Sequence, residues 1–330
     1  NIPYSYIQKG TNSQATISDS TLSGVFRVEA GTVNTNDSLI SHLGKERQGV
    51  VVLQGATATF SNTTIELEPY YYIYGSTING SFNNDGTVSL TNQSKLIINN
   101  ETKGRFIALV NKGNFNLDNS EFSYAYNSDA TGYYSTPVYG IYSRAGNINI
   151  TNNSTVNFDF SNLSPSSNST TAYGLYVEGG TVNVLDSNLD FTTTTGKTLY
   201  GAYIKNASND VTADVNIDRG HIYVTGANTS YGVYIDGSKS SFTMGVKETD
   251  TSKYGTDFAI KDSPIVKATG ATTGIGIKHP TGIFNYYDGE IIGSSAAKPE
   301  GATDAEYEYE TKETLGADGN YHCVLDWIHN

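Results

Sequence analysis

Apolar and polar residues alternate in three short runs between Tyr173 and Phe191. The runs are Tyr173–Val177, Thr181–Leu185 and Asn188–Phe191, separated by short turn-like segments. Alternation over about four to eight residues is typical of a strand with one buried face. A unit of three such strands cannot bury its apolar face alone and needs a neighbour on each side. The stretch therefore predicts one layer of a larger stack.

The second run recurs along the chain and sets the register of a repeat. The spacing between equivalent residues varies from 25 (Asn34 to Thr59) to 42 (Thr243 to Asn285). A propeller blade needs about 40–45 residues and four strands, and a leucine-rich repeat needs a leucine ladder, which this chain lacks. The central residues of the nine copies are Asn34, Thr59, Ser89, Asn116, Asn149, Asn183, Asn216, Thr243 and Asn285.

The first and third strands recur in the same register. The first reads Tyr-Gly-x-Tyr from Tyr139, Tyr173, Tyr200 and Tyr231, and the third follows a turn carrying Asn, Asp or Ser. Three strands repeated in register predict an all-β fold: a right-handed parallel β-helix (β-solenoid) with three strands per coil and about nine to ten coils. Adjacent coils would stack about 4.8 Å apart.

The repeat ends near residue 293 and defines two expected domains. We expect residues 1–293 to form the parallel β-helix and residues 294–330 to form a linker and a C-terminal β-hairpin, which acts as a cap or a small module. The hairpin strands are predicted at 306–311 and 321–328, around a turn at 316–320. A solenoid needs such a cap because its terminal coil exposes unpaired backbone and apolar side chains.

The segment Phe284–Gly293, with the sequence FNYYDGEIIG, is followed by this acidic hairpin. Over roughly the last 50 residues the chain resembles the repeat of long, adhesin-like β-solenoid surface proteins of Gram-positive gut bacteria. His322-Cys323 and Trp327-Ile328 depart from the usual ending of that repeat. Over the solenoid the resemblance is general and is shared with autotransporter passengers. It implies a bacterial surface protein and transfers no catalytic residues.

Composition restricts the partners and the compartment. A net charge of −13 excludes a nucleic-acid surface, which needs clustered Lys and Arg, and keeps a long rod soluble. The single Cys323 excludes an internal disulfide framework and a thiolate zinc site. Neither a membrane span nor a signal peptide is visible, and the start at Asn1 suggests a mature or trimmed fragment. We expect a secreted or cell-surface protein; the oligomeric state is left open.

Polysaccharide hydrolases and lyases also use parallel β-helices, and their chemistry requires specific residues on neighbouring coils. Glycoside hydrolysis needs two carboxyls about 5–10 Å apart, and Asp186 and Asp218 occupy similar turn positions one coil apart. An Asp in a turn more often bonds to its own backbone. The five arginines are scattered, and the five histidines have no metal-ligand spacing. The prediction is no enzyme, no catalytic residue, no metal and no cofactor.

Stacking of the middle strands places a column of asparagines on the outside. Alternation directs Val182 and Val184 inward and Asn183 outward. Side-chain amides can hydrogen-bond along such a column, and we interpret it as structural support rather than a ligand site. The ladder comprises Asn34, Asn116, Asn149, Asn183, Asn216 and Asn285.

The first strands predict an exposed aromatic stripe. If Leu175 and Val177 face inward, Gly174 and Tyr176 face outward. The stripe is then Tyr142, Tyr176, Tyr203 and Tyr234, whose rings can stack on one another or bind sugar rings or a partner protein. A shift of one residue would expose Tyr139, Tyr173, Tyr200 and Tyr231 instead. A longer loop adds Tyr133 and Tyr134 as candidate binding residues.

These patterns favour a non-enzymatic extracellular adhesin or stalk that binds a glycan or a host surface protein. Two alternatives stay open. One is a carbohydrate-active β-helix, which would require convergent carboxylates on neighbouring coils. The other is a phage tail-spike-like receptor-binding protein, which intertwined trimerisation would support.

Overall fold

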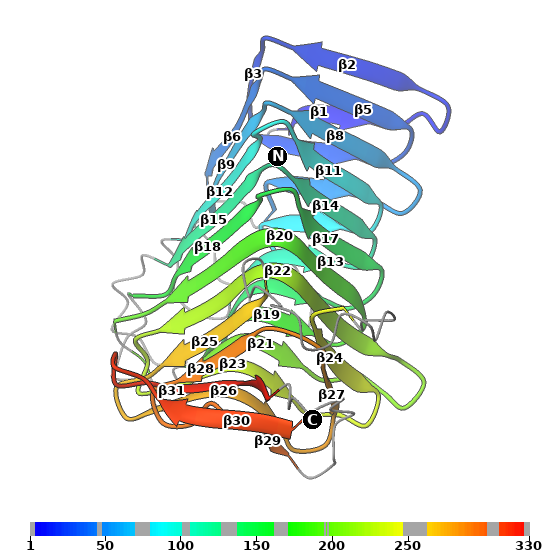
Figure 1. The fold of residues 1–330 in the computed structure, drawn as a ribbon. Coiled ribbons are helices and arrows are strands. Elements are labelled where there is room, and N and C mark those ends of the chain that lie inside the picture. The colour runs from blue at the N-terminus through cyan, green and yellow to red at the C-terminus, as the bar shows by residue number, and fades with distance from the viewer. Residues whose placement is uncertain are drawn as a thin grey trace.

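The computed structural model describes residues 4–44, 48–69, 80–100, 106–126, 137–161, 171–194, 196, 198–246, 263–301 and 310–326. Within these ranges the chain forms strands β1 to β31 and no helix. The strands form two long sheets that run the length of an elongated molecule (Figure 1). All-β architecture and stacked parallel sheets of this length are consistent with a β-solenoid.

The eleven-stranded sheet collects the first strand of every repeat. Its neighbouring strands are parallel throughout, from β1 to β29. The strands are β1 (Tyr4–Gln8), β4 (Val25–Val28), β7 (Val50–Val52), β10 (Phe82–Asn84), β13 (Phe106–Asn111), β16 (Val138–Ser143), β19 (Thr171–Val177), β21 (Thr198–Ile204), β23 (Thr229–Ile235), β26 (Thr273–His279) and β29 (Glu300–Gly301).

The twenty-stranded sheet collects the middle and third strands. The middle strands are β2 (Gln14–Ser18), β5 (Thr32–Asn36), β8 (Thr57–Ser61), β11 (Thr87–Thr91), β14 (Asn114–Asp118), β17 (Asn147–Thr151), β24 (Ser240–Met244) and β27 (Ile283–Tyr286). The third strands are β3 (Thr21–Ser23), β6 (Leu39–Gly44), β9 (Thr64–Pro69), β12 (Lys95–Asn100), β15 (Glu121–Tyr126), β18 (Thr155–Asp159), β25 (Ile265–Thr269) and β28 (Glu290–Gly293). In two repeats one bent strand serves both roles: β20 (Gly180–Thr192) and β22 (Ala213–Thr225).

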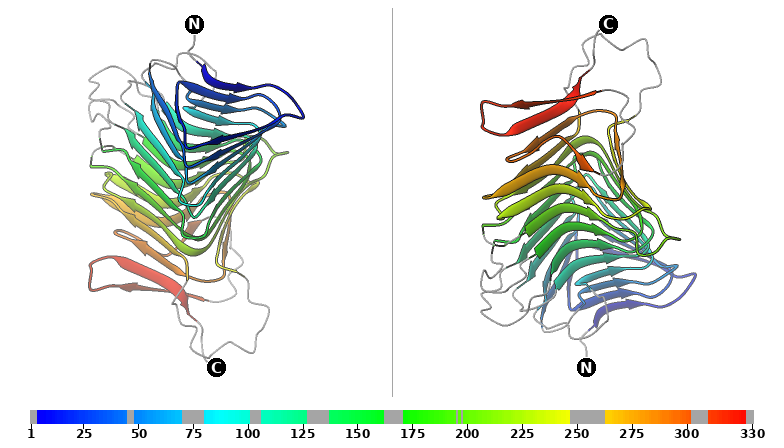
Figure 2. Two further views of the ribbon diagram at one scale, coloured as in Figure 1. Left: turned by 90° about the horizontal axis from the view of Figure 1, so that it is seen from above. Right: turned by 90° about the horizontal axis from the view of Figure 1, so that it is seen from below.

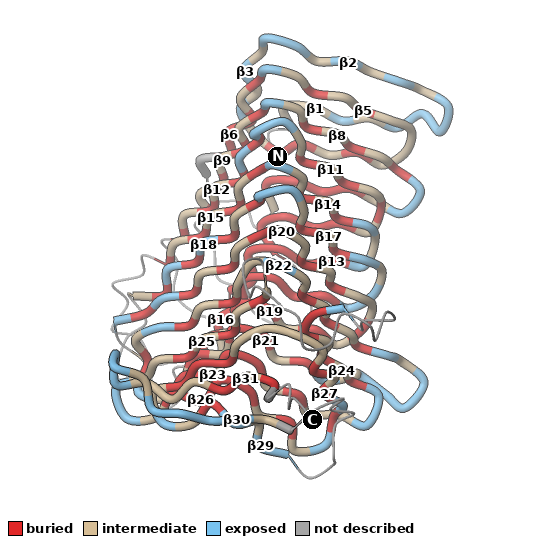
Figure 3. The backbone as a smooth tube through the Cα atoms, viewed as in Figure 1, coloured by how far each residue is buried: buried red, intermediate tan, exposed pale blue. Residues whose placement is uncertain are grey.

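The register predicted for the middle strands is confirmed. Asn34 pairs with Thr59, Thr59 with Ser89 and so on to Thr243 with Asn285, with no position shifted. One further repeat precedes them, because Thr16 of β2 pairs with Asn34. Buried and partly exposed residues alternate along these strands (Figure 3), as expected for strands with one face on the core.

A column of left-handed residues turns the chain from the middle to the third strand. Asn and Asp tolerate positive φ better than other non-glycine residues, and they hold most of these positions. The column comprises Asp19, Asp37, Asn62, Asn92, Asn119, Asn152, Asp186 and Arg219. Serines just beyond the corner tie repeats together; for example, Ser154 Oγ accepts from Ser120 N at 3.1 Å and Ser187 Oγ from Ser154 N at 3.2 Å.

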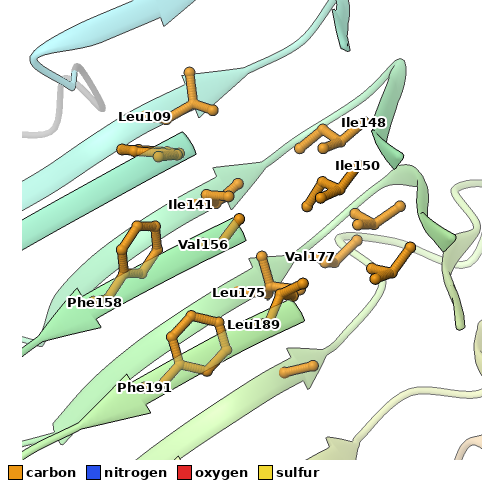
Figure 4. Packing of buried hydrophobic residues seen from close by; sticks show 14 of the residues in the cluster. Leu109, Ile141, Ile148, Ile150, Val156, Phe158, Leu175, Val177, Leu189 and Phe191 are labelled. Atoms are coloured by element: carbon orange, nitrogen blue, oxygen red, sulfur yellow. The ribbon is translucent and has the colours of Figure 1, made fainter. Parts of the chain in front are cut away.

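The interior is one continuous apolar column in which the three strands of each repeat meet (Figure 4). Phe158 and Phe191, from successive third strands, are almost completely buried and lie with ring centroids 5.4 Å apart. Phe191 packs on the backbone of the first strand at Gly174, where an added Cβ would lie 2.6 Å from its ring atoms. Gly140 makes room for Phe158 in the same way, whereas Gly201 and Gly232 contact the aliphatic side chains Val224 and Val266.

The C-terminal hairpin lies at the end of the stack opposite the first repeat (Figure 2). Strands β30 (Glu310–Leu315) and β31 (Tyr321–Asp326) pair antiparallel, and β31 pairs antiparallel with β28. The predicted first strand, 306–311, falls mostly outside the described residues. His322 Nδ1 lies 2.7 Å from Glu290 Oε1 and fastens the hairpin to β28. The backbone edge of the last third strand is thereby covered.

Gly174→Ala is expected to destabilise the fold by about 1–3 kcal/mol, because the new methyl group collides with Phe191 in a filled core. Chemical denaturation with tyrosine fluorescence as the readout measures the change. In a Phe191→Leu background the same substitution should cost much less, since the smaller side chain vacates the contact. An equal cost in both backgrounds would contradict the proposed packing role of the glycine.

Candidate functional site

Both tyrosine columns of the first strands lie on the outer face of the eleven-stranded sheet. Along β19 the order is Tyr173 out, Gly174 and Leu175 in, Tyr176 out and Val177 in, as burial and the Gly174–Phe191 contact show. Strict alternation is interrupted at the glycine, and every neighbouring first strand repeats the interruption. The prediction that Gly174 faces outward and that only one tyrosine column is outside is therefore wrong.

The eight tyrosines form a plate that we call the tyrosine plate. It consists of an inner column, Tyr139, Tyr173, Tyr200 and Tyr231, and an outer column, Tyr142, Tyr176, Tyr203 and Tyr234. Consecutive inner-column rings are nearly parallel, with centroids 5.0–5.1 Å apart. In the outer column, Tyr176, Tyr203 and Tyr234 stack at 5.3 Å. Rings of the two columns meet edge to face, at 79° for Tyr173 and Tyr176. Aromatic pairs favour both arrangements.

The stacking limits which parts of the tyrosine rings a ligand can reach. Each ring lies against its column neighbours, so an internal ring has no free face for a flat ligand. Tyr139 and Tyr142, at 8% and 3% exposure, are buried with Ile107 and Val110 of β13, while the other six rings are partly exposed. Beyond the last pair, β26 places Ile275 and Lys278 at the equivalent positions. The accessible part of the plate is thus ring edges and hydroxyl groups.

Charged residues two positions after the outer column border the plate. Tyr203 Oη donates to Asp236 Oδ2 at 2.9 Å, and Lys205 Nζ lies 3.0 Å from the same oxygen. Arg144 Nε and Glu178 Oε2 are 4.0 Å apart two repeats earlier in the series. Sequence reasoning did not identify this row. The sequence feature that identifies this row is a charged residue two positions after each Tyr-Gly-x-Tyr motif.

Burial raises the pKa of several tyrosines in the plate. It raises the pKa of Tyr173 to about 12, with a smaller contribution from Tyr139. Burial also raises the pKa of Tyr142 and Tyr203, and each hydroxyl gains a further increase from the next carboxylate, Glu178 or Asp236. A phenolate is disfavoured beside a carboxylate and inside an aromatic stack.

The predicted asparagine column is a hydrogen-bonded ladder over four repeats. Nδ2 donates to the Oδ1 of the preceding repeat at 2.9 Å from Asn149 to Asn116, from Asn183 to Asn149 and from Asn216 to Asn183. Asn116 Nδ2 donates to Ser89 Oγ at 3.2 Å. Asn34 and Asn285 lie in the same column but are separated from this run by Thr59 and Thr243.

The acidic pair considered for hydrolysis is bridged by a guanidinium. Asp186 holds the left-handed corner, Arg219 holds the equivalent corner of the next repeat, and Asp218 lies one position before it. Arg219 contacts Asp186 Oδ2 at 3.2 Å and Asp218 Oδ2 at 3.6 Å. Burial raises the pKa of Asp218, which Arg219 partly offsets. This geometry is that of an ion-pair network on the corner.

Other predicted sites have simpler outcomes. Tyr133 and Tyr134 lie outside the described residues. Across the described ranges no three His, Cys, Asp or Glu side chains gather as metal ligands. The same ranges contain no helix that is long and apolar enough to span a bilayer.

Comparison of the chain with protein-family models, with curated proteins and with solved structures finds no match.

Stability should fall as the pH rises from about 10 to about 12. Unfolded tyrosines ionise near pH 10, whereas Tyr173 in the plate holds its proton to about pH 12, so unfolding releases protons in this window. Urea unfolding across the window measures the slope, and phenolate absorbance gives the folded titration. Replacing Tyr173, Tyr176, Tyr200 and Tyr203 with Phe should flatten the dependence. A pKa near 10 for Tyr173 in the folded protein would contradict the prediction.

Proposed function

We propose that the protein is a non-enzymatic, extracellular bacterial surface protein that acts as an adhesin or stalk. In this proposal the stacked strands close into a right-handed β-helix of nine to ten coils with three strands each. Residues 1–293 form the shaft and residues 294–330 a linker and capping hairpin. The protein is secreted or held at the cell surface, and it binds a glycan or a host surface protein.

One observation carries the proposal: the tyrosine plate extends over four successive repeats on an outer face. The main core does not include these rings, so packing of the interior does not explain them. Partly exposed aromatic side chains with hydroxyl groups are enriched where proteins bind partners. The regular array of hydroxyl groups and ring edges suits an extended ligand that meets several repeats at once.

A carbohydrate-active enzyme is the second candidate and has weaker support. It would need two free carboxyls that converge on a substrate. Asp186 and Asp218 instead share Arg219. A phage tail-spike-like receptor binder is the third candidate, and a trimeric state in solution would favour it.

Tyr176→Ala/Tyr203→Ala is expected to weaken binding to a glycan and mucin panel by about tenfold or more, equivalent to ~1.4 kcal/mol. Immobilised panels and a reducing-sugar assay of the same samples provide the two readouts. Tyr176→Phe/Tyr203→Phe retains the stacked rings and removes only the hydroxyls, so comparison with the alanine variant separates the contribution of the hydroxyl groups from that of the ring edges. Normal binding by the alanine variant would rule out the plate, and release of oligosaccharides would rule out the non-enzymatic role.

A further inference from the structure

A groove of about 390 Å³ lies on the outer face of the middle strands, beside the asparagine ladder. It spans the repeats that also carry Tyr173 to Tyr234, on a different face of the molecule from the tyrosine plate. Ligand pockets are commonly about 300–1,000 Å³. The residues that define it are Asn183, Asn216, Asp218, Thr243, Val246 and Tyr287.

The groove coincides with the break in the asparagine ladder. Asn216 Nδ2 donates to Asn183 Oδ1 at 2.9 Å, which continues the ladder to this point. The next repeat has Thr243, whose Oγ1 instead accepts from Asn285 Nδ2 at 3.2 Å. Among the described residues no donor reaches Asn216 Oδ1. A ladder amide also uses only one of its two N–H groups, so the groove offers both acceptors and donors.

Apolar and charged groups form the rest of the groove. Val246 is 66% exposed, and partly exposed Leu185 and Tyr287 add further carbon surface. Asp218 lines the groove, and the pKa of its carboxyl is raised first by burial and then by the nearby Asp186 and Asp288 carboxylates. Arg219 pairs with Asp186 and Asp218, and Asp288 lies close enough to raise the pKa of Asp218 further, so carboxylates outnumber the guanidinium here. This charge disfavours an anionic ligand.

We infer that this groove binds a short segment of a neutral polysaccharide. Sugar hydroxyls meet the amides of Asn183 and Asn216 and the hydroxyl of Thr243, while the apolar face of a pyranose covers Val246 and Tyr287. Stacked strands repeat about every 4.8 Å, close to the length of one pyranose unit in an extended chain. Successive repeats therefore address successive sugar units. The inference builds on the proposed glycan-binding role but assigns it a second surface.

The test titrates the full chain with cellohexaose, xylohexaose, mannohexaose and chitohexaose, and with hexagalacturonate as the acidic probe, by NMR or calorimetry. At least one neutral probe should bind, and Asn216→Ala should weaken that binding at least tenfold. Asn116→Ala is the control, because it removes a ladder asparagine two repeats before Asn183, the first asparagine of the groove lining. Asn116→Ala removes two ladder hydrogen bonds and Asn216→Ala removes one, so the control should lower the melting temperature at least as much, and only Asn216→Ala should lose affinity.

Three further variants test the apolar lining and the charge of the groove. Val246→Glu should weaken neutral-probe binding at least fivefold, whereas Ile283→Glu, an equivalent change at an exposed aliphatic side chain outside the groove lining, should change it less than twofold. Asp218→Asn should strengthen hexagalacturonate binding severalfold. Unchanged binding in Asn216→Ala and Val246→Glu, or no binding of any neutral probe to the wild type, would overturn the inference.

The outcomes for the groove and for the proposed function are separable. Loss of mucin binding in Tyr176→Ala/Tyr203→Ala without any neutral-probe binding would leave the adhesin role intact and remove the groove. Cleavage of a probe that binds in an Asn216-dependent way would establish the groove and overturn the non-enzymatic role. Product analysis of the titration mixtures distinguishes the two cases.

Discussion

Parallel backbone hydrogen bonding in an unshifted register is the constraint on which the rest of the structure depends. Each middle strand pairs residue for residue with the equivalent strand of the next repeat. Every side chain must therefore be compatible with the same position one layer above and below. Apolar positions become a continuous core, and outward positions become columns of identical groups. Corners obey the same rule, which is why left-handed Asn and Asp residues and serine hydroxyls recur there.

The two outward columns use this constraint in different ways. Asparagine amides complement one another, because the donor of one repeat meets the acceptor of the repeat before it and links the two repeats. Tyrosine rings complement one another through offset stacking, and their hydroxyls are left at the surface with carboxylates beside them. The ladder thus stabilises the stack internally, whereas the plate directs polar and aromatic groups outward. Where the ladder is interrupted at Thr243, a groove opens.

The tyrosine plate illustrates how a core requirement shapes a surface. Phe158 and Phe191 need space against the first strands, and Gly140 and Gly174 provide it by facing inward. The following residue must also face inward, so the tyrosines on both sides of the pair are directed outward. The result is two interlocked aromatic columns in place of one. Gly201 and Gly232 face inward against Val224 and Val266, so the surface that supports the proposed binding role follows from the packing of core side chains against the glycine of each first strand.

The sequence by itself determined the repeat, the strand order and the register of the middle strands, because a period-2 pattern that must match its neighbours leaves little freedom in pairing. It also identified the asparagine column and a hairpin near the C-terminus. Only the tertiary structure decided which faces of the first strands are exposed, because the break at Gly174 depends on contact with Phe191 from another strand. The register of the middle strands already places Arg219 opposite Asp186. Only the structure shows that the Arg219 guanidinium contacts both Asp186 and Asp218, because these ion pairs depend on side-chain directions at the left-handed corner.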